Sequence, residues 1–433
     1  MSNIYLKLWR DPTRISFSSL RPLFSGSFLV VNTVVLVFFC HSAKAAIIGK
    51  TIRPYMSYTM LADDNILRIR DKINAKDLPN INTNNLFDIS HRLTGGASFD
   101  KRISRQHLSA NGSWSHNRYE KFNHLNNQAI NLRGNWNWFV GNRFEGNMGV
   151  SFNKGQAPFL FLPGIINITT QQTEFFNFAW HFHPSWKLRG DYSHFNFKSD
   201  NRLLQFQNRV EDIFETGFDY IARSGSTVGI QYRNIQGKFT EPVPLPNETF
   251  TINNYDQNEI KGKINWLLTG KSRVEFLGGW VERRNTSLSS NDFSGLNARL
   301  TYNWQPTSKI GITLSGWRET VAIQSLNANF SVATGMSVSP SWRLTEKIKL
   351  TGNFSYLSQK LDSFLNLNNQ TEQASRGLNN DVVTASIELT YVPYPGLEVS
   401  TSAQHNSLST NSPLGGFNAN GATINLRYIL GRP

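Results

Sequence analysis

Long stretches with an apolar residue at every second position constrain the fold of this chain more than any other feature. Between residues 130 and 138, one strand face would carry only apolar residues and glycine, and the other only Asn and Arg. The same division recurs at residues 259–268, 296–304 and 422–430. A period of two residues predicts β-strands that each have one apolar and one polar face.

The length of these stretches distinguishes a soluble sandwich from a membrane barrel. Sandwich strands run mostly about 5–6 residues, whereas a tilted strand needs about 9–11 residues to cross a bilayer. Tryptophans also recur beside turns, as an interfacial girdle requires: Trp138, Trp180, Trp186, Trp304 and Trp342. The sequence therefore predicts an all-β, transmembrane antiparallel β-barrel, with apolar faces toward lipid and polar faces toward a wet lumen.

The connections between the predicted strands alternate in length. Short turns are expected at Lys101–Arg105, Gly141–Arg143, His183–Ser185, Ser224–Ser226, Gly270–Ser272, Pro306–Ser308, Thr345–Lys347 and Tyr394–Gly396. Longer polar loops lie between them, for example at Pro158–Pro163, Glu241–Asn254, Asp362–Asn380 and Ser407–Gly415. Short periplasmic turns and longer extracellular loops in this order imply about 18 strands. The first strand, near Ile52–Met60, would pair with the last, near Ala422–Leu430. The turn spacing of roughly 40 residues is also that of propeller repeats, but the Gly-His and Trp-Asp signatures of propellers are absent.

The N-terminal segment predicts export. Lys7, Arg10, Arg14 and Arg21 precede an apolar run from Phe28 to Cys40, followed by Ala43-Lys44-Ala45. A basic region, an apolar core and a small-residue cleavage site form a signal peptide. We expect residues 1–45 to be the signal and residues 46–433 to form the barrel in the bacterial outer membrane. Cleavage would remove Cys40, the single cysteine, and with it disulfides and thiolate chemistry.

The charge of the chain is strongly positive. The formal net charge is +14, and residues 1–45 carry five Lys or Arg against one Asp, which leaves about +10 on the mature part. Nucleic acid is not expected as a partner, because an exported protein meets lipopolysaccharide and acidic polymers instead. Outer-membrane lipid and lipopolysaccharide are therefore the expected surroundings.

No catalytic or metal-binding constellation stands out in the sequence. His181 and His183 are two residues apart, but no third histidine or carboxylate is near them in sequence. Other histidines suit a polar lumen or loops better than a Ser/His or Asp/His catalytic site. We expect no enzyme activity, no cofactor and no bound metal.

The charged residues on the polar strand faces are the candidate functional residues. The pore-lining candidates are Arg133, Arg189, Arg233, Lys261, Lys263, Arg299, Lys349 and Arg427. Carboxylates share these faces, among them Glu215, Asp219 and Glu259. This mixture predicts a slight preference for anions. The abundant Asn and Ser on the same faces suit sugars as well as ions.

The start of the predicted barrel carries a more specific signal. Ile52-Arg53-Pro54-Tyr55 is followed by Asp63-Asp64-Asn65-Ile66-Leu67-Arg68. These residues and the terminal strand, Ala422 to Leu430, resemble the EpsL-type outer-membrane barrels of exopolysaccharide operons, the β-barrel porin 2 group. The chain departs from that pattern by ending in Gly431-Arg432-Pro433 instead of a terminal aromatic residue.

The resemblance implies a passive conduit that exports exopolysaccharide. Its partners would be the exopolysaccharide chain and periplasmic export components. The alternative is a general or oligosaccharide diffusion porin. A barrel enzyme acting on lipid or glycan is the third interpretation. Pore diameter and wall chemistry would set selectivity in the first two.

Overall fold

The computed structural model describes residues 51–78, 81–159, 164, 166–244, 250–287, 292–322, 330–361 and 378–431. The predicted signal, residues 1–45, lies outside them and stays a prediction. Helical structure in these ranges consists of three short 3-10 segments, Ala75–Asp77, Asn123–Leu125 and Arg202–Gln207. Within the part of the chain described, no helix combines the length and the apolar character needed to cross a membrane.

Eighteen long strands form a single antiparallel sheet. They are β1 (Ile52–Asp63), β2 (Asp88–Ile103), β3 (Gln106–Tyr119), β4 (Asn127–Val140), β5 (Phe144–Gln156), β6 (Ile168–His183), β7 (Trp186–Ser199), β8 (Arg209–Ile221), β9 (Thr227–Phe239), β12 (Tyr255–Thr269), β13 (Ser272–Asn285), β14 (Phe293–Trp304), β15 (Ile310–Ala322), β16 (Phe330–Arg343), β17 (Ile348–Leu361), β18 (Leu378–Tyr391), β19 (Leu397–Thr410) and β20 (Phe417–Ile429). Two short strands, β10 (Val243–Pro244) and β11 (Phe250–Thr251), pair separately in the loop after β9.

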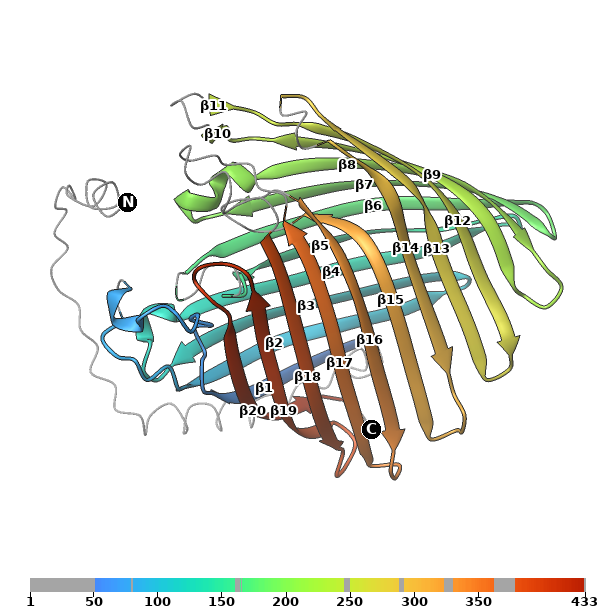
Figure 1. The fold of residues 1–433 in the computed structure, drawn as a ribbon. Coiled ribbons are helices and arrows are strands. Elements are labelled where there is room, and N and C mark those ends of the chain that lie inside the picture. The colour runs from blue at the N-terminus through green and yellow to red at the C-terminus, as the bar shows by residue number, and fades with distance from the viewer. Residues whose placement is uncertain are drawn as a thin grey trace, which may run out of the picture. The chain divides into compact units, whose positions relative to one another are not determined.

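The sheet closes on itself, because β1 pairs with both β2 and β20. At the seam Thr59 is the direct partner of Asn425, and its hydroxyl donates to the Asn425 Oδ1 at 2.9 Å. Every long strand therefore has two neighbours, and no edge is left unpaired. Closure confirms the predicted barrel, the strand number and the pairing of the first strand with the last. Figure 1 shows tight turns at one end of the wall and the 3-10 segments and the β10–β11 hairpin at the other.

Strand boundaries differ from the sequence prediction mainly at the loop end. The long strands run from 12 residues, as in β1, to 16 residues, as in β2. This is longer than the roughly 9–11 residues that a bilayer crossing requires. Residues 407–410, predicted as loop, belong to β19, and residues 378–380 belong to β18. The side chains there are mostly polar, but backbone pairing continues beyond the apolar part of the wall. All eight predicted turns are present, whereas parts of the loops at Pro158–Pro163, Glu241–Asn254 and Asp362–Asn380 lie outside the described residues.

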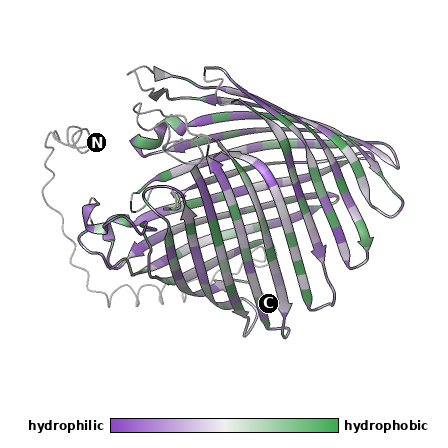
Figure 2. Cartoon of the chain, viewed as in Figure 1, coloured by the Kyte–Doolittle hydropathy of each residue, from purple (hydrophilic) through white to green (hydrophobic). Residues whose placement is uncertain are grey.

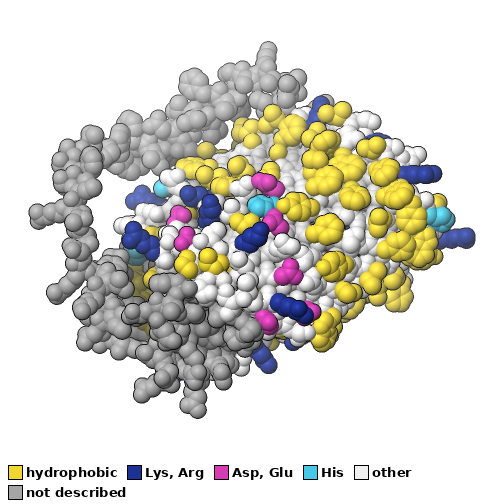
Figure 3. All heavy atoms as spheres, turned by 90° about the horizontal axis from the view of Figure 1, so that it is seen from above, with side chains coloured by type: hydrophobic (Ala, Val, Ile, Leu, Met, Phe, Trp, Pro, Cys, Tyr) yellow, Lys and Arg dark blue, Asp and Glu magenta, His cyan; other side chains and the backbone are white. Residues whose placement is uncertain are grey.

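The two faces of the wall differ in chemistry as the alternation predicts. On β14, Leu300 is on the outer face with 49% of its surface exposed, and Arg299 is on the inner face. Figure 2 shows hydrophobic and hydrophilic residues alternating along the strands. Figure 3 shows hydrophobic side chains gathered in a band on the molecular surface, with Lys and Arg at its margins.

Aromatic side chains mark both borders of this apolar band. The outward-facing Trp180, Trp304 and Trp342, each 40–46% exposed, lie next to the turns. A second ring lies nearer the loops, and each of its members hydrogen-bonds a polar side chain: Tyr58 with His91, Trp114 with Gln128, Tyr192 with Asp212, Tyr232 with Asn258, Trp280 with Ser294, and Tyr356 with Asp381. Amphipathic rings at two levels are typical of membrane interfaces. A closed barrel with an even number of strands and this outer belt is a bacterial outer-membrane protein.

Candidate functional site

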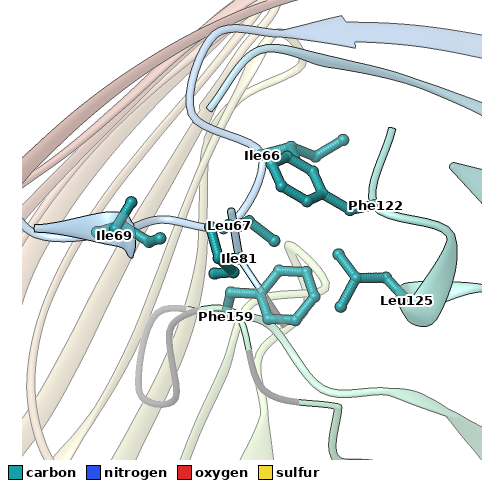
Figure 4. Close-up of a cluster of buried hydrophobic side chains, with 8 residues drawn as sticks. Ile66, Leu67, Ile69, Ile81, Phe122, Leu125 and Phe159 are labelled. Carbon is teal, nitrogen blue, oxygen red and sulfur yellow. The ribbon is translucent and has the colours of Figure 1, made fainter. Parts of the chain in front are cut away.

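The first long connection, between β1 and β2, folds into a packed structure that we call the loop cap. Its apolar side chains form a buried cluster with residues of the next two loops. Figure 4 shows Ile66, Leu67 and Ile81 beside Phe122, Leu125 and Phe159. Leu67 and Leu125 are 0% and 1% exposed. Because burying one such side chain stabilises by about 1.5–3 kcal/mol, the loop cap is an ordered part of the barrel mouth.

Polar contacts stabilise the loop cap and attach it to other loops. The Asn65 amide nitrogen Nδ2 donates to the Ile69 carbonyl at 3.0 Å, and the Ile69 N–H donates back to Asn65 Oδ1 at 3.0 Å. The Asp71 N–H donates to the Gly416 carbonyl in the last loop at 2.7 Å. The Gly164 N–H donates to the Leu67 carbonyl at 3.2 Å. The loop cap is thus joined to the third and the last loop.

The structure places all eight predicted pore-lining residues on the inner face of the wall. Each alternates with outward-facing neighbours, as Arg189 does with the exposed Leu188 and Lys261 with the exposed Ile260. The cross-strand registers bring four of them together on neighbouring strands, namely Arg189, Arg233, Lys261 and Lys263. Arg133, Arg299, Lys349 and Arg427 lie on other parts of the wall.

The clustered side chains form a row of alternating charges that we call the charge ladder: Asp219, Arg189, Glu215, Arg233, Glu259 and Lys261. Arg189 donates to Asp219 at 2.8 Å and lies 3.5 Å from Glu215. Arg233 lies 2.9 Å from Glu215 and 3.7 Å from Glu259. The Lys261 ammonium donates to Glu259 at 2.6 Å. Basic and acidic groups therefore neutralise one another along this side of the lumen.

Polar contacts extend the charge ladder toward the loops. Gln257 lies between Glu259 and Arg283, and the Arg283 Nε donates to the Gln257 oxygen at 2.8 Å. The Arg283 guanidinium also stacks on the Tyr255 ring at 3.8 Å from its centroid. The Tyr255 hydroxyl donates to Glu211 at 2.7 Å, and Glu211 accepts from Arg209 at 2.6 Å. A continuous network thus spans β7, β8, β9, β12 and β13.

The remaining predicted pore-lining residues differ in whether a carboxylate lies close enough to neutralise their charge. Arg299 makes a two-pronged contact with Glu319 at 2.9 and 2.6 Å. Arg427 lies 3.9 Å from Glu398 and stacks on Tyr55. Arg133, Lys263 and Lys349 have no carboxylate within 4.0 Å in the described ranges. These three side chains therefore contribute uncompensated positive charge to the lumen.

The turn end of the barrel carries an excess of positive charge. Exposed basic residues gather there: Lys101, Arg102, Arg105, Arg143, Arg223, Lys271, Lys309, Arg343 and Lys347. They outnumber the carboxylates at the same end, which include Asp100, Glu145, Glu346 and Glu398. Some bridge adjacent turns, as Lys271 does by donating to the Pro306 carbonyl at 3.1 Å and Lys347 to the Pro393 carbonyl at 2.8 Å. This rim therefore contributes a large part of the net positive charge.

A cavity of about 510 Å³ lies between the loop cap and the inner wall of β1 to β6. Ile66, Arg68 and Phe159 line it from the loops, and Asn and Gln side chains line it from the strands. Sequence reasoning missed this cavity. The cap residues form a recognisable motif in the sequence, but their packing depends on loops that are distant in sequence.

The histidines make local contacts. His181 hydrogen-bonds Glu145 at 2.9 Å, and the His183 ring nitrogen accepts from the Ser185 N–H at 3.1 Å. Over the described ranges, no group of three or more His, Cys, Asp or Glu side chains is arranged to hold a metal ion. The absence of enzyme activity stays a prediction.

Comparison with known proteins gives structural likenesses alone. No family model and no curated protein matches the sequence. Acinetobacter baumannii OccAB3 matches with 10% identity and a TM-score of 0.43, over 88% of this chain and 99% of that one. Pseudomonas aeruginosa OccK2 (OpdF) has 9% identity and a TM-score of 0.46, over 88% and 98%. A BenF-like porin from Pseudomonas fluorescens Pf-5 has 9% identity and a TM-score of 0.45, over 88% and 99%. Identities near 10% carry no information on substrate. None of these three structures is described as an EpsL-type barrel.

Proposed function

We propose that this protein is an outer-membrane diffusion porin for small polar solutes. The observation that carries the proposal is the combination of a closed barrel, a polar inner wall and an ordered loop cap at its mouth. An 18-stranded barrel is wide enough to enclose an aqueous channel. A packed cap narrows the route at the loop end and favours small solutes over a polymer.

The polysaccharide-export interpretation rests on the residues at the start of the barrel and on the terminal strand, Ala422 to Leu430. Asp63, Asn65 and Arg68, which belong to that motif, hold the loop cap together. This structural role accounts for their presence without a polymer. A wall that offers hydrogen bonds and balanced charges supports passage of hydrophilic solutes by diffusion.

Conductance and uptake measurements test this proposal. Purified barrel reconstituted in planar bilayers should give stable, ohmic ion channels, and liposomes containing it should swell in small sugars. Deleting the gene should reduce uptake of small polar nutrients and leave surface exopolysaccharide unchanged. Loss of surface exopolysaccharide with normal uptake would instead support export and overturn the porin proposal.

A further inference from the structure

We propose that the cavity under the loop cap is a binding site for a short, uncharged saccharide. This inference deepens the proposed porin function, on which it rests, by naming a substrate class. It is carried by three amide side chains at the cavity wall, Asn131, Asn153 and Gln171, which we call the amide row.

The strand register aligns the amide row. Asn131 on β4 is the direct partner of Asn153 on β5, and Asn153 is the direct partner of Gln171 on β6. All three side chains are on the inner face, and neighbouring strands lie about 4.8 Å apart. Each amide offers two N–H donors and an acceptor oxygen. None of the three amides has a hydrogen-bond partner in the described part of the protein, so these groups are available to a ligand.

The wall above the amide row is rigid. The Arg92 Nε donates to Asn117 Oδ1 at 2.6 Å, and Asn117 Nδ2 donates to Asn127 Oδ1 at 2.7 Å. Asn127 Nδ2 donates in turn to the Leu125 carbonyl at 2.9 Å. Asn117 and Asn127 are 8% and 9% exposed. These side chains are therefore already fixed by one another, in contrast to the amide row.

The loop side of the cavity combines apolar side chains with Arg68. Ile66 and Phe159 line it from the loop cap, and Phe159 is held in the buried cluster. A saccharide presents hydroxyls at its edges and C–H groups on its faces. An amide-lined wall opposite these apolar side chains matches both, and ligand sites generally combine apolar walls with a few fixed polar groups.

The charged groups that line the cavity are only partly compensated. Arg92 and Lys154 have no carboxylate within 4.0 Å in the described ranges, and the Arg92→Gln variant described below tests whether this charge contributes to recognition. The Asp63 carboxylate is neutralised by Arg68, with Nη1 and Nη2 at 2.7 and 2.8 Å from its two oxygens. Arg92 uses its Nε for Asn117. The volume of about 510 Å³ lies within the range of roughly 300–1,000 Å³ that small-ligand sites occupy.

The test compares the triple variant Asn131→Ala, Asn153→Ala, Gln171→Ala with the control Asn137→Ala. Asn137 is on the same strand and face as Asn131 but does not line the cavity. Maltose is the probe, added to the full barrel in detergent for calorimetry and to bilayers for current block. We expect the triple variant to weaken maltose binding roughly tenfold or more, and the control to bind as the wild type does.

Two outcomes would overturn the inference. The first is a wild-type barrel that conducts ions but does not bind maltose, or that binds maltose no better than the triple variant does. Either result would contradict the saccharide site and leave the porin proposal standing. A large loss of binding in Arg92→Gln with none in the triple variant would assign recognition to charge instead. If neither the wild type nor any variant conducted ions, the porin function itself would be contradicted. Calorimetry with maltose would still show whether the cavity binds a saccharide.

Discussion

Asp63 and Arg68 form a two-pronged ion pair at the point where β1 passes into the loop cap. The Arg68 guanidinium donates to the two Asp63 oxygens at 2.7 and 2.8 Å, and Asp63 is 1% exposed. Arg68 has a φ of 56°, in the left-handed region that is unfavourable for most side chains. The ion pair therefore helps to hold a strained turn, and the rest of the loop cap depends on that turn.

Replacing Asp63 with Asn should loosen the loop cap and leave the barrel folded. The change removes the charge that Arg68 binds, and we expect a cost of about 1.5–3 kcal/mol to the closed cap. Limited proteolysis should cut faster within residues 64–87, while the mobility of the unheated barrel on gels stays normal. The control Asp77→Asn changes an exposed carboxylate and should have little effect. Unchanged protection in Asp63→Asn would show that the hydrophobic cluster alone holds the cap.

Acid should weaken the loop cap through His124, which lies in the loop between β3 and β4 with its ring centroid 6.2 Å from that of Phe122, a residue of the buried cluster. Burial lowers the pKa of His124 below its ordinary value of 6.5, and the buried Nε2 has no hydrogen-bond partner in the described structure. The opened cap therefore takes up a proton more readily than the closed cap does. Stability is complete above about pH 6.5 and falls as the pH drops below that value toward the lowered pKa. Protease sensitivity should rise between pH 7.5 and pH 5, and the rise should be smaller in His124→Gln. An equal rise in both proteins would exclude His124 as the cause.

The barrel could be predicted from sequence because the residues of each strand alternate between those that face lipid and those that face water. Residues 130–138 or 296–304 show by themselves which face meets lipid and which meets water. The loop cap and the charge ladder could not be predicted in the same way. Leu67 packs near Phe122 and Phe159, and Arg189 pairs with Asp219 across β7 and β8. These neighbours are set by strand register and loop packing, which residue periodicity does not specify.

Opposite substitutions at Leu300 and Arg299 test the two faces of β14. Leu300→Arg should cost about 2–4 kcal/mol if position 300 lies near the bilayer midplane. Arg299→Gln should cost less, because its side chain faces the lumen and Gln can still hydrogen-bond Glu319. Urea-dependent unfolding in lipid vesicles measures both. Equal destabilisation by the two changes would contradict the assigned register.

Closure between β1 and β20 can be tested with an engineered disulfide. Thr59 and Asn425 are direct partners on the inner face, and Cα atoms of such pairs lie about 4.5–5.5 Å apart, within reach of a disulfide. The double change Thr59→Cys, Asn425→Cys should cross-link on oxidation of the mature protein. The control Thr59→Cys, Ile424→Cys places the second thiol on the outer face and should not cross-link. Efficient cross-linking of the control would mean that the seam register is wrong.

Ion selectivity should respond in opposite directions to changes at neighbouring positions of the charge ladder. Arg233 lies 2.9 Å from Glu215, so Arg233→Gln makes the lumen more negative and Glu215→Gln makes it more positive. We expect the first variant to lose and the second to gain preference for chloride over potassium. Each change should be modest, less than about twofold at physiological salt, because counter-ions screen fixed charges beyond about 8 Å.

Reversal potentials across a salt gradient in planar bilayers measure the effect, and the double variant should return close to the wild-type value. Arg133→Ser provides the comparison, since Arg133 has no carboxylate within 4.0 Å in the described ranges and its removal deletes an uncompensated charge. If Arg233→Gln and Glu215→Gln shifted the ion selectivity in the same direction, the charge ladder would affect selectivity through the shape of the pore and not through its electrostatic field.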